Sequence, residues 1–186
     1  MTTPILAFLG GSGLDNAGRT WASYFDFDDA AWEECHQHIQ WMFPLPEASK
    51  MQPSSPIATQ ADYDEIAGSP ILRAKMVMSL CRYLLFLHRT SQWRVARDHN
   101  HLRITRVIRC LSWCGLNDQA IDFCDYVVGQ VGDIVGKRTV WYWEEASSAT
   151  RRGWTDGAPS HQGPRTSHGG HLPVRPGALV RLRCAP

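Results

Sequence analysis

Three arginines recur at every third position within one short stretch of the chain, at Arg103, Arg106 and Arg109. Trp93 stands ten residues before the first of them. A guanidinium group near an aromatic ring can bind a carboxylate or a phosphate through two parallel hydrogen bonds. The same arginines could pair with neighbouring helices, because residues 1–146 carry 17 Asp and Glu against 13 Lys and Arg. Three interpretations therefore stay open: structural ion pairs, a site for an anion or a peptide C-terminus, and contact with nucleic acid. Between the first two arginines, we expect the structural pair at Arg103, which lies nearer the apolar stripe, and the contact role at Arg106.

Two further pairs of residues are candidates for ligand contacts. His99 and Asn100 stand just before the arginines, and Gln40 and Trp41 stand just before a proline-rich segment. A tryptophan beside prolines can form one wall of a peptide groove. The alternative is structural, with Trp41 packed beneath the proline-rich segment as part of the core.

No pattern in the sequence predicts a catalytic, cofactor or metal site. His99-Asn100-His101 has the letters of the HNH nuclease motif. In that motif the residues are spread over a ββα unit, whereas here they are adjacent at the start of a helix. The glycines at 10, 11 and 13 lack both the third glycine of a dinucleotide loop and the lysine of a phosphate loop. Neither HExxH nor CxxC spacing is present to hold a metal. We expect a protein that is not an enzyme and that carries no cofactor.

The arginines lie on a predicted helix that the rest of the chain is expected to surround. Apolar residues recur at helical spacing from Ile104 to Cys114 and form one continuous stripe. Asp98 or Asn100 can cap the start of this helix, and Gly115 can end it in a left-handed conformation.

Similar signals predict the remaining elements. Helices are expected over residues 4–10, 28–43, 59–68, 70–88, 117–135 and 139–146, with a short turn at 20–25 and a loop over 44–58. The helix over 70–88 is apolar around a wide arc, which predicts a place in the middle of the core. The predicted fold class is all-α, with a single compact domain of about six or seven helices over residues 4–146.

The end of the chain has a different composition. Residues 147–186 are rich in Pro, Gly and Arg and lack a periodic apolar pattern. Such a segment buries too little apolar surface to offset its conformational entropy, so it is predicted to be a disordered tail. The alternative is that it translates a different reading frame, because the same residues dominate frame-shifted GC-rich sequences.

The composition also indicates the partners and the cellular compartment that we expect for the protein. The net charge is only +1 and the basic excess lies in the tail, which argues against nucleic acid as the main partner. No apolar stretch is long and uncharged enough for a membrane span, and the first residues lack a secretory signal. The six cysteines have no CxxC spacing and are expected to be free thiols in a reducing compartment. The expected location is the cytoplasm.

Two stretches resemble conserved blocks of a known family. Residues 38–45, His-Ile-Gln-Trp-Met-Phe-Pro-Leu, look like the I-Q-W-L-F-P-L block of the opioid growth factor receptor conserved domain. Residues 99–108, His-Asn-His-Leu-Arg-Ile-Thr-Arg-Val-Ile, resemble the H-N-x-L-R-I-T-R-I-L block of the same family. The two blocks occur in the family's order, and the resemblance covers roughly residues 5–146. Met42 stands where leucine is usual, and Trp113-Cys114 stand where other members often carry Glu-Leu.

The resemblance implies a binding function rather than a reaction. The animal receptor of this family is described as a receptor for an enkephalin peptide, associated with the nuclear envelope, and the family has no agreed catalytic residues. This chain is similar to its short stand-alone members. We therefore expect a non-catalytic, receptor-like binding module with a peptide or protein partner; a nucleic-acid-associated protein that uses the arginine helix and the basic tail is the alternative. The candidate ligand-binding residues are Gln40, Trp41, Trp93, His99, Asn100, Arg103 and Arg106.

Overall fold

The protein folds into α-helices joined by loops throughout the part of the chain that a computed structural model describes, residues 2–131 and 133–151. This confirms the predicted all-α class, although the described residues form eight α-helices instead of six or seven. The helices are α1 (Pro4–Gly10), α2 (Asp29–Glu34), α3 (His38–Met42), α4 (Gln60–Gly68), α5 (Pro70–Arg89), α6 (Asn100–Trp113), α7 (Asn117–Val131) and α8 (Lys137–Arg151), and a 3-10 helix, η1 (Ala22–Phe25), precedes α2.

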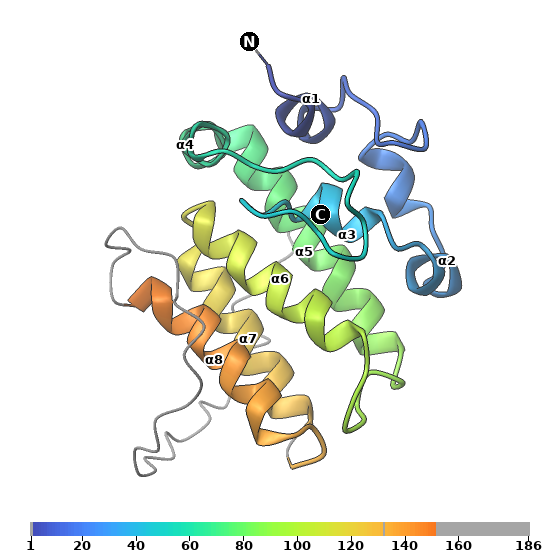
Figure 1. Ribbon diagram of the computed structural model, residues 1–186, viewed down its shortest axis with the longest axis vertical. Helices are drawn as coiled ribbons and strands as arrows, with labels where there is room; N and C mark the ends of the chain where they lie inside the picture. Colours follow the sequence, from blue (N-terminus) through green and yellow to red (C-terminus); the bar gives the residue numbers. More distant parts are fainter. Residues whose placement is uncertain (1, 132, 152–186) are drawn as a thin grey trace.

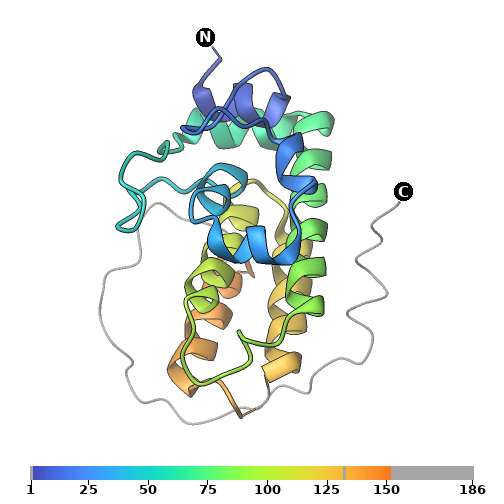
Figure 2. The same ribbon diagram turned by 90° about the vertical axis from the view of Figure 1, so that its right-hand side faces the viewer.

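The helices form two groups that share α5 (Figures 1 and 2). One group consists of the short helices α1–α4, of which α1, α2 and α4 contact α5. The longer helices α6, α7 and α8 all contact one another. In Figure 2, α5 runs along one side of the molecule and passes both groups.

The predicted central helix is confirmed as α6. Its stripe is fully buried, and α7 and α8 both pack against it. The predicted stop is present as well, because Gly115 adopts a φ of 67°. Leu116 folds back and donates its backbone N–H to the carbonyl of Leu111 at 2.9 Å, as in a Schellman-type helix end.

The single helix predicted over residues 28–43 is wrong, because the chain breaks between α2 and α3. Cys35 leaves the helical region with a ψ of 111°. The imidazole Nδ1 of His38 lies 2.6 Å from the carbonyl oxygen of Cys35, so the side chain satisfies a backbone group that the break exposes. The break lets Trp32 and Trp41 both enter the core, where each is buried. Periodicity alone cannot detect such a change of direction.

The start signals of α4 and α5 are confirmed. The Thr59 hydroxyl accepts from the backbone of Asp62, and the Asp62 carboxylate accepts from the backbone of Thr59, which completes a capping box. Ser69 caps α5, with Pro70 at its first position. The expected place of α5 in the middle of the core is wrong for one face of the helix. Ile71, Met78 and Leu85 are exposed on that face, because in the described residues the short N-terminal helices and α6–α8 cover only the other side.

The cysteine prediction is confirmed at four positions. Cys110, Cys114 and Cys124 are buried free thiols, and Cys35 is a half-buried one. The prediction is wrong at Cys81, which is disulfide-bonded. Cys81 is half-buried on α5, and Cys184 lies outside the described residues.

The remaining predictions concern the C-terminal tail and the membrane. The tail predicted over 147–186 lies outside the described residues, apart from its first five residues, which continue α8. Among the described residues, no helix combines the length and the apolar character that a membrane crossing requires.

Candidate anion-binding site on helix α6

The start of α6 is tied to α2 by a cluster of polar side chains around Arg103. This arginine is buried, and its Nη1 donates to the Glu33 carboxylate at 3.4 Å and to the Asn100 side-chain oxygen at 3.1 Å. Its Nη2 donates to the Glu33 carbonyl oxygen at 3.0 Å. The ion pair with an acid of a neighbouring helix that the sequence predicted for Arg103 is therefore confirmed, and this guanidinium has few hydrogens left for a ligand.

His99 and Asn100 belong to the same cluster. The Asn100 amide donates to both Glu33 carboxylate oxygens, at 3.3 and 3.1 Å. The His99 Nε2 lies 3.1 Å from Glu33 Oε1, and the His99 side chain is about half exposed, at 47%. Glu33 therefore connects three of the predicted site residues. Of the three, only His99 is open to a ligand at the surface.

Arg106 is placed differently from its two neighbours in the arginine series. It is partly buried beneath the segment that follows α3, and its Nη1 donates to the Phe43 carbonyl oxygen at 3.2 Å. Burial lowers the pKa of the Arg106 guanidinium. Within the described part of the chain, Arg106 makes no ion pair. A partly desolvated cation with donors to spare is a site where an anion is bound strongly.

Arg109, one turn further on, is paired with the loop that covers this region. Its Nη1 and Nη2 donate to the two carboxylate oxygens of Glu47, at 2.6 and 3.3 Å. Glu47 is exposed and Arg109 is half-buried, so a competing carboxylate can reach the pair from the side of Glu47. Arg106 and Arg109 thus lie about one turn apart on α6, and the Glu47 carboxylate is the acid near both of them.

The three remaining predicted residues lie inside the fold. Trp93 is fully buried and donates its indole N–H to the Leu87 carbonyl at 2.9 Å. Trp41 is 4% exposed and packs on Phe8, with 5.1 Å between the ring centres. Gln40 is buried with its side-chain amide against the backbone carbonyls before it. Their burial places them in the supporting core, which matches the structural alternative for Trp41.

The sequence did not identify Glu33 or Glu47 as the partners of these arginines. Each acid lies more than 60 residues from the arginine that it pairs with. Glu33 faces α6 only because the chain breaks after α2. The spacing of residues along the chain does not reveal this contact. The surplus of acids in residues 1–146 indicated only that acidic partners for the arginines were available.

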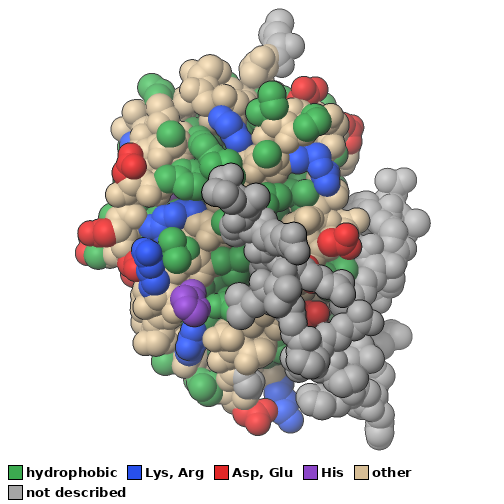
Figure 3. All heavy atoms as spheres, turned by 180° about the vertical axis from the view of Figure 1, so that it is seen from behind, with side chains coloured by type: hydrophobic (Ala, Val, Ile, Leu, Met, Phe, Trp, Pro, Cys, Tyr) green, Lys and Arg blue, Asp and Glu red, His purple; other side chains and the backbone are tan. Residues whose placement is uncertain are grey.

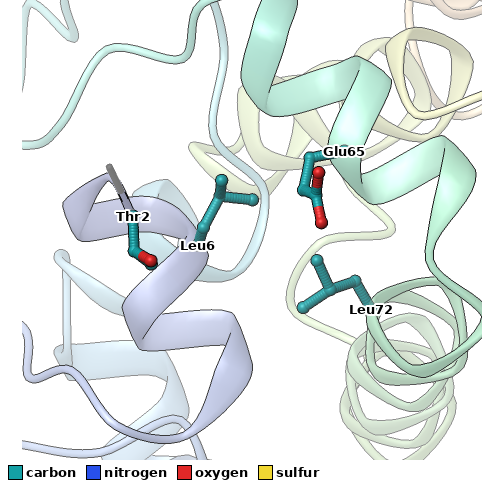
Figure 4. A pocket seen from close by; sticks show the side chains of 4 residues that line it. All are labelled: Thr2, Leu6, Glu65 and Leu72. Carbon is teal, nitrogen blue, oxygen red and sulfur yellow. The ribbon is translucent and has the colours of Figure 1, made fainter.

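A cavity of about 440 Å³ lies elsewhere, among α1, α4 and α5. It is lined by Thr2, Leu6, Glu65 and Leu72 (Figure 4). This lining provides a single carboxylate and a hydroxyl between two leucine side chains. None of the predicted site residues reaches the cavity.

No group of three or more His, Cys, Asp or Glu side chains in the described residues is arranged to hold a metal ion. No family model, curated protein or solved structure matches this chain.

Proposed function

We propose that this protein is a non-catalytic binding module that holds the carboxylate of a peptide partner at Arg106, and that it acts in the cytoplasm. The observation that carries the proposal is the contrast along α6. Arg103 and Arg109 each have a carboxylate partner, whereas the partner of Arg106 among the described residues is a carbonyl oxygen. A partly desolvated guanidinium gains most from an incoming carboxylate, because water no longer competes fully for its hydrogens.

The resemblance to the opioid growth factor receptor domain supports a peptide as the partner. The two blocks that carry the resemblance provide Phe43 and Arg106, which are hydrogen-bonded to each other. The pairing of Arg103 and Arg109 with acids argues against the nucleic-acid alternative. Little unpaired charge remains on α6 to follow a phosphate backbone.

Isothermal titration calorimetry with an enkephalin peptide tests the proposal. The peptide is used with a free C-terminal carboxylate and as its C-terminal amide, which differ in the group that Arg106 is proposed to bind. We expect the amide to bind at least about tenfold more weakly, in line with the loss of a charge-assisted hydrogen bond. Arg106→Gln should remove this difference.

The matched control is Arg138→Gln, which neutralises an exposed arginine of α8. This variant should bind the acid and amide forms like the wild-type protein. Equal affinity of the wild-type protein for the two peptide forms, or no binding of either form, would refute the proposal. A steep dependence of binding on salt, with the acid and amide forms alike, would favour contact with a polyanion instead.

A further inference from the structure

The Glu47 carboxylate lies at the pair of guanidinium groups that Arg106 and Arg109 form on α6. Arg109 donates through Nη1 and Nη2 to the two carboxylate oxygens of Glu47, at 2.6 and 3.3 Å. A guanidinium binds a free carboxylate through the same two parallel hydrogen bonds. Burial has the largest effect on the pKa of Arg106, and the charges of Glu47 and Arg109 shift this pKa in opposite directions. The three groups are therefore close enough to interact with one another.

The segment between α3 and α4 carries Glu47, and the base of this segment is fixed in the core. Leu45 and Ala58 are both 3% exposed, and the backbone N–H of Ala58 donates to the Leu45 carbonyl oxygen at 3.0 Å. Glu47 and its two neighbours in the chain are exposed. The segment projects from the side of the molecule away from α5 (Figure 2). Release of Glu47 from Arg109 therefore does not require the base of the segment to open.

The Arg109–Glu47 pair is exposed enough to be replaced by another carboxylate. The Glu47 side chain is 54% exposed and the Arg109 side chain 28%. An ion pair between partly exposed side chains contributes little net free energy, because water competes for both charges. The Arg103–Glu33 pair differs, since the Arg103 side chain is only 7% exposed. Of these two pairs on α6, the Arg109 pair is the one that an incoming carboxylate can displace.

Positive charge alone does not distinguish this place on the surface. Lys and Arg side chains also lie at several places on the face seen in Figure 3. On α6, however, Arg106 donates to a carbonyl oxygen while Arg109, one turn away, donates to a carboxylate. A second carboxylate at this place meets two cations but is repelled by Glu47, because like charges at one site oppose each other. A ligand carboxylate and Glu47 therefore exclude each other.

We propose that Glu47 is a built-in competitor for the carboxylate of the peptide partner. In the free protein Glu47 pairs with Arg109. On binding, the ligand carboxylate replaces Glu47 and is shared by Arg106 and Arg109, while the Glu47 side chain turns to solvent. The proposal rests on the proposed function, because it requires a peptide carboxylate at Arg106. It adds that competition within the chain sets the affinity of the site.

Isothermal titration calorimetry with Glu47→Gln tests the proposal. The probes are the free-acid and C-terminal amide forms of an enkephalin peptide. Glutamine keeps the length of the side chain and removes its charge. We expect the acid form to bind Glu47→Gln at least about threefold more tightly than it binds the wild-type protein, because no exposed ion pair has to be broken. The amide form should bind both proteins alike.

The salt dependence of binding provides a second measurement. In the wild-type protein binding replaces one ion pair by another, so salt should change the affinity for the acid form little. In Glu47→Gln binding forms an ion pair without breaking one, so the affinity should fall more steeply as salt is raised. A substitution that only loosened the segment would leave the salt dependence unchanged.

The matched control is Glu144→Gln, which removes the same charge from an exposed position of α8. This variant should keep the wild-type affinity and salt dependence. Adding Arg109→Gln to Glu47→Gln should abolish the gain in affinity, because one of the two cations is then missing. Circular dichroism should verify that every variant is folded.

Two results would overturn this proposal alone. The first is an affinity of Glu47→Gln for the acid form that equals or falls below that of the wild-type protein, while the wild-type protein still prefers the acid to the amide. The second is an equal gain for the acid and amide forms, which would show that the segment covers the surface without competing for a carboxylate. If neither protein binds either peptide form, the proposed function fails and this proposal fails with it.

Discussion

The chain before α5 and the chain after it are held together by different means. The helices α1–α4 have between 5 and 9 residues, which is too short for a helix to be stable alone. The helices α6–α8 have 14 or 15 residues and pack closely on one another. A short helix is stable only where its surroundings hold it, so the first region depends on contacts that fix its loops.

Aromatic side chains provide many of those contacts. Trp32 donates its indole N–H to the Tyr24 carbonyl at 2.9 Å, and the Tyr63 hydroxyl donates to the Pro44 carbonyl at 3.1 Å. Each ring fills the core and also satisfies a backbone group of a loop. In α6–α8 the helices themselves satisfy most backbone groups, although the indole N–H of Trp143 also donates to the His101 carbonyl at 3.1 Å. Single aromatic substitutions should therefore damage the first region more than changes of similar size damage the second.

The largest expected effect comes from Trp41→Ala in the first region. Trp41 is almost fully buried against Phe8, and removing a buried aromatic side chain costs about 3–5 kcal/mol. The matched control is Trp141→Ala on α8, where 37% of the residue is exposed. We expect a cost of less than about 1 kcal/mol there. Urea unfolding measures both, and similar losses in the two variants would show that the burial of Trp41 does not stabilise the first region.

A smaller effect is expected where the two regions meet, at Arg103. Arg103→Gln leaves the Glu33 carboxylate without its guanidinium partner. Removing one member of a buried pair costs about 3–5 kcal/mol, and the exposure of a quarter of the Glu33 side chain should reduce this to about 2 kcal/mol.

Arg109→Gln provides the control, because the Arg109–Glu47 pair is partly exposed and should contribute less than about 1 kcal/mol. Thermal melts at low and high salt separate the two variants. The Arg109 contribution should fade with salt, whereas the Arg103 contribution should persist. If Arg103→Gln is as stable as the wild-type protein, the two regions are not held together by this cluster.

The same contrast explains how far the sequence predicted the fold. The signals for α4, α5 and α6 are local, since a capping box, a Ser-Pro start and a final glycine act within one turn of the helix. These elements were predicted to within a residue or two. The break after α2 depends on where Trp32, His38 and Trp41 find space in the core, which is a tertiary effect that spacing does not record.

The candidate site was predicted less completely than the fold. Arg103 and Arg106 have the same residue type and lie three positions apart, and the sequence did assign the structural role to Arg103 and the contact role to Arg106. Their different surroundings come from Glu33 and Phe43, which lie 70 and 63 residues away from them in the chain. The sequence also could not indicate that Ile71, Met78 and Leu85 of α5 are exposed, because a buried and an exposed apolar face have the same spacing.

A pH effect of about the same size as that of Arg103→Gln is expected in the first region. His38 is fully buried, and burial, with a contribution from the Arg103 charge, lowers the pKa of its imidazole to about 3. In the unfolded chain the imidazole takes up a proton below about pH 6.5. The folded state stays neutral over that range, so stability is lost as the pH falls from about 6.5 toward 3.

At pH 5 the loss should reach about 2 kcal/mol relative to pH 7, because each pH unit below the unfolded pKa contributes about 1.4 kcal/mol. His38→Asn keeps a donor for the Cys35 carbonyl and removes the titrating ring. Urea unfolding between pH 7 and 5 should therefore give a flatter dependence in this variant than in the wild-type protein. His88→Asn, at an exposed position of α5, should retain the wild-type slope. Parallel curves for His38→Asn and the wild-type protein would show that His38 does not make the first region sensitive to acid.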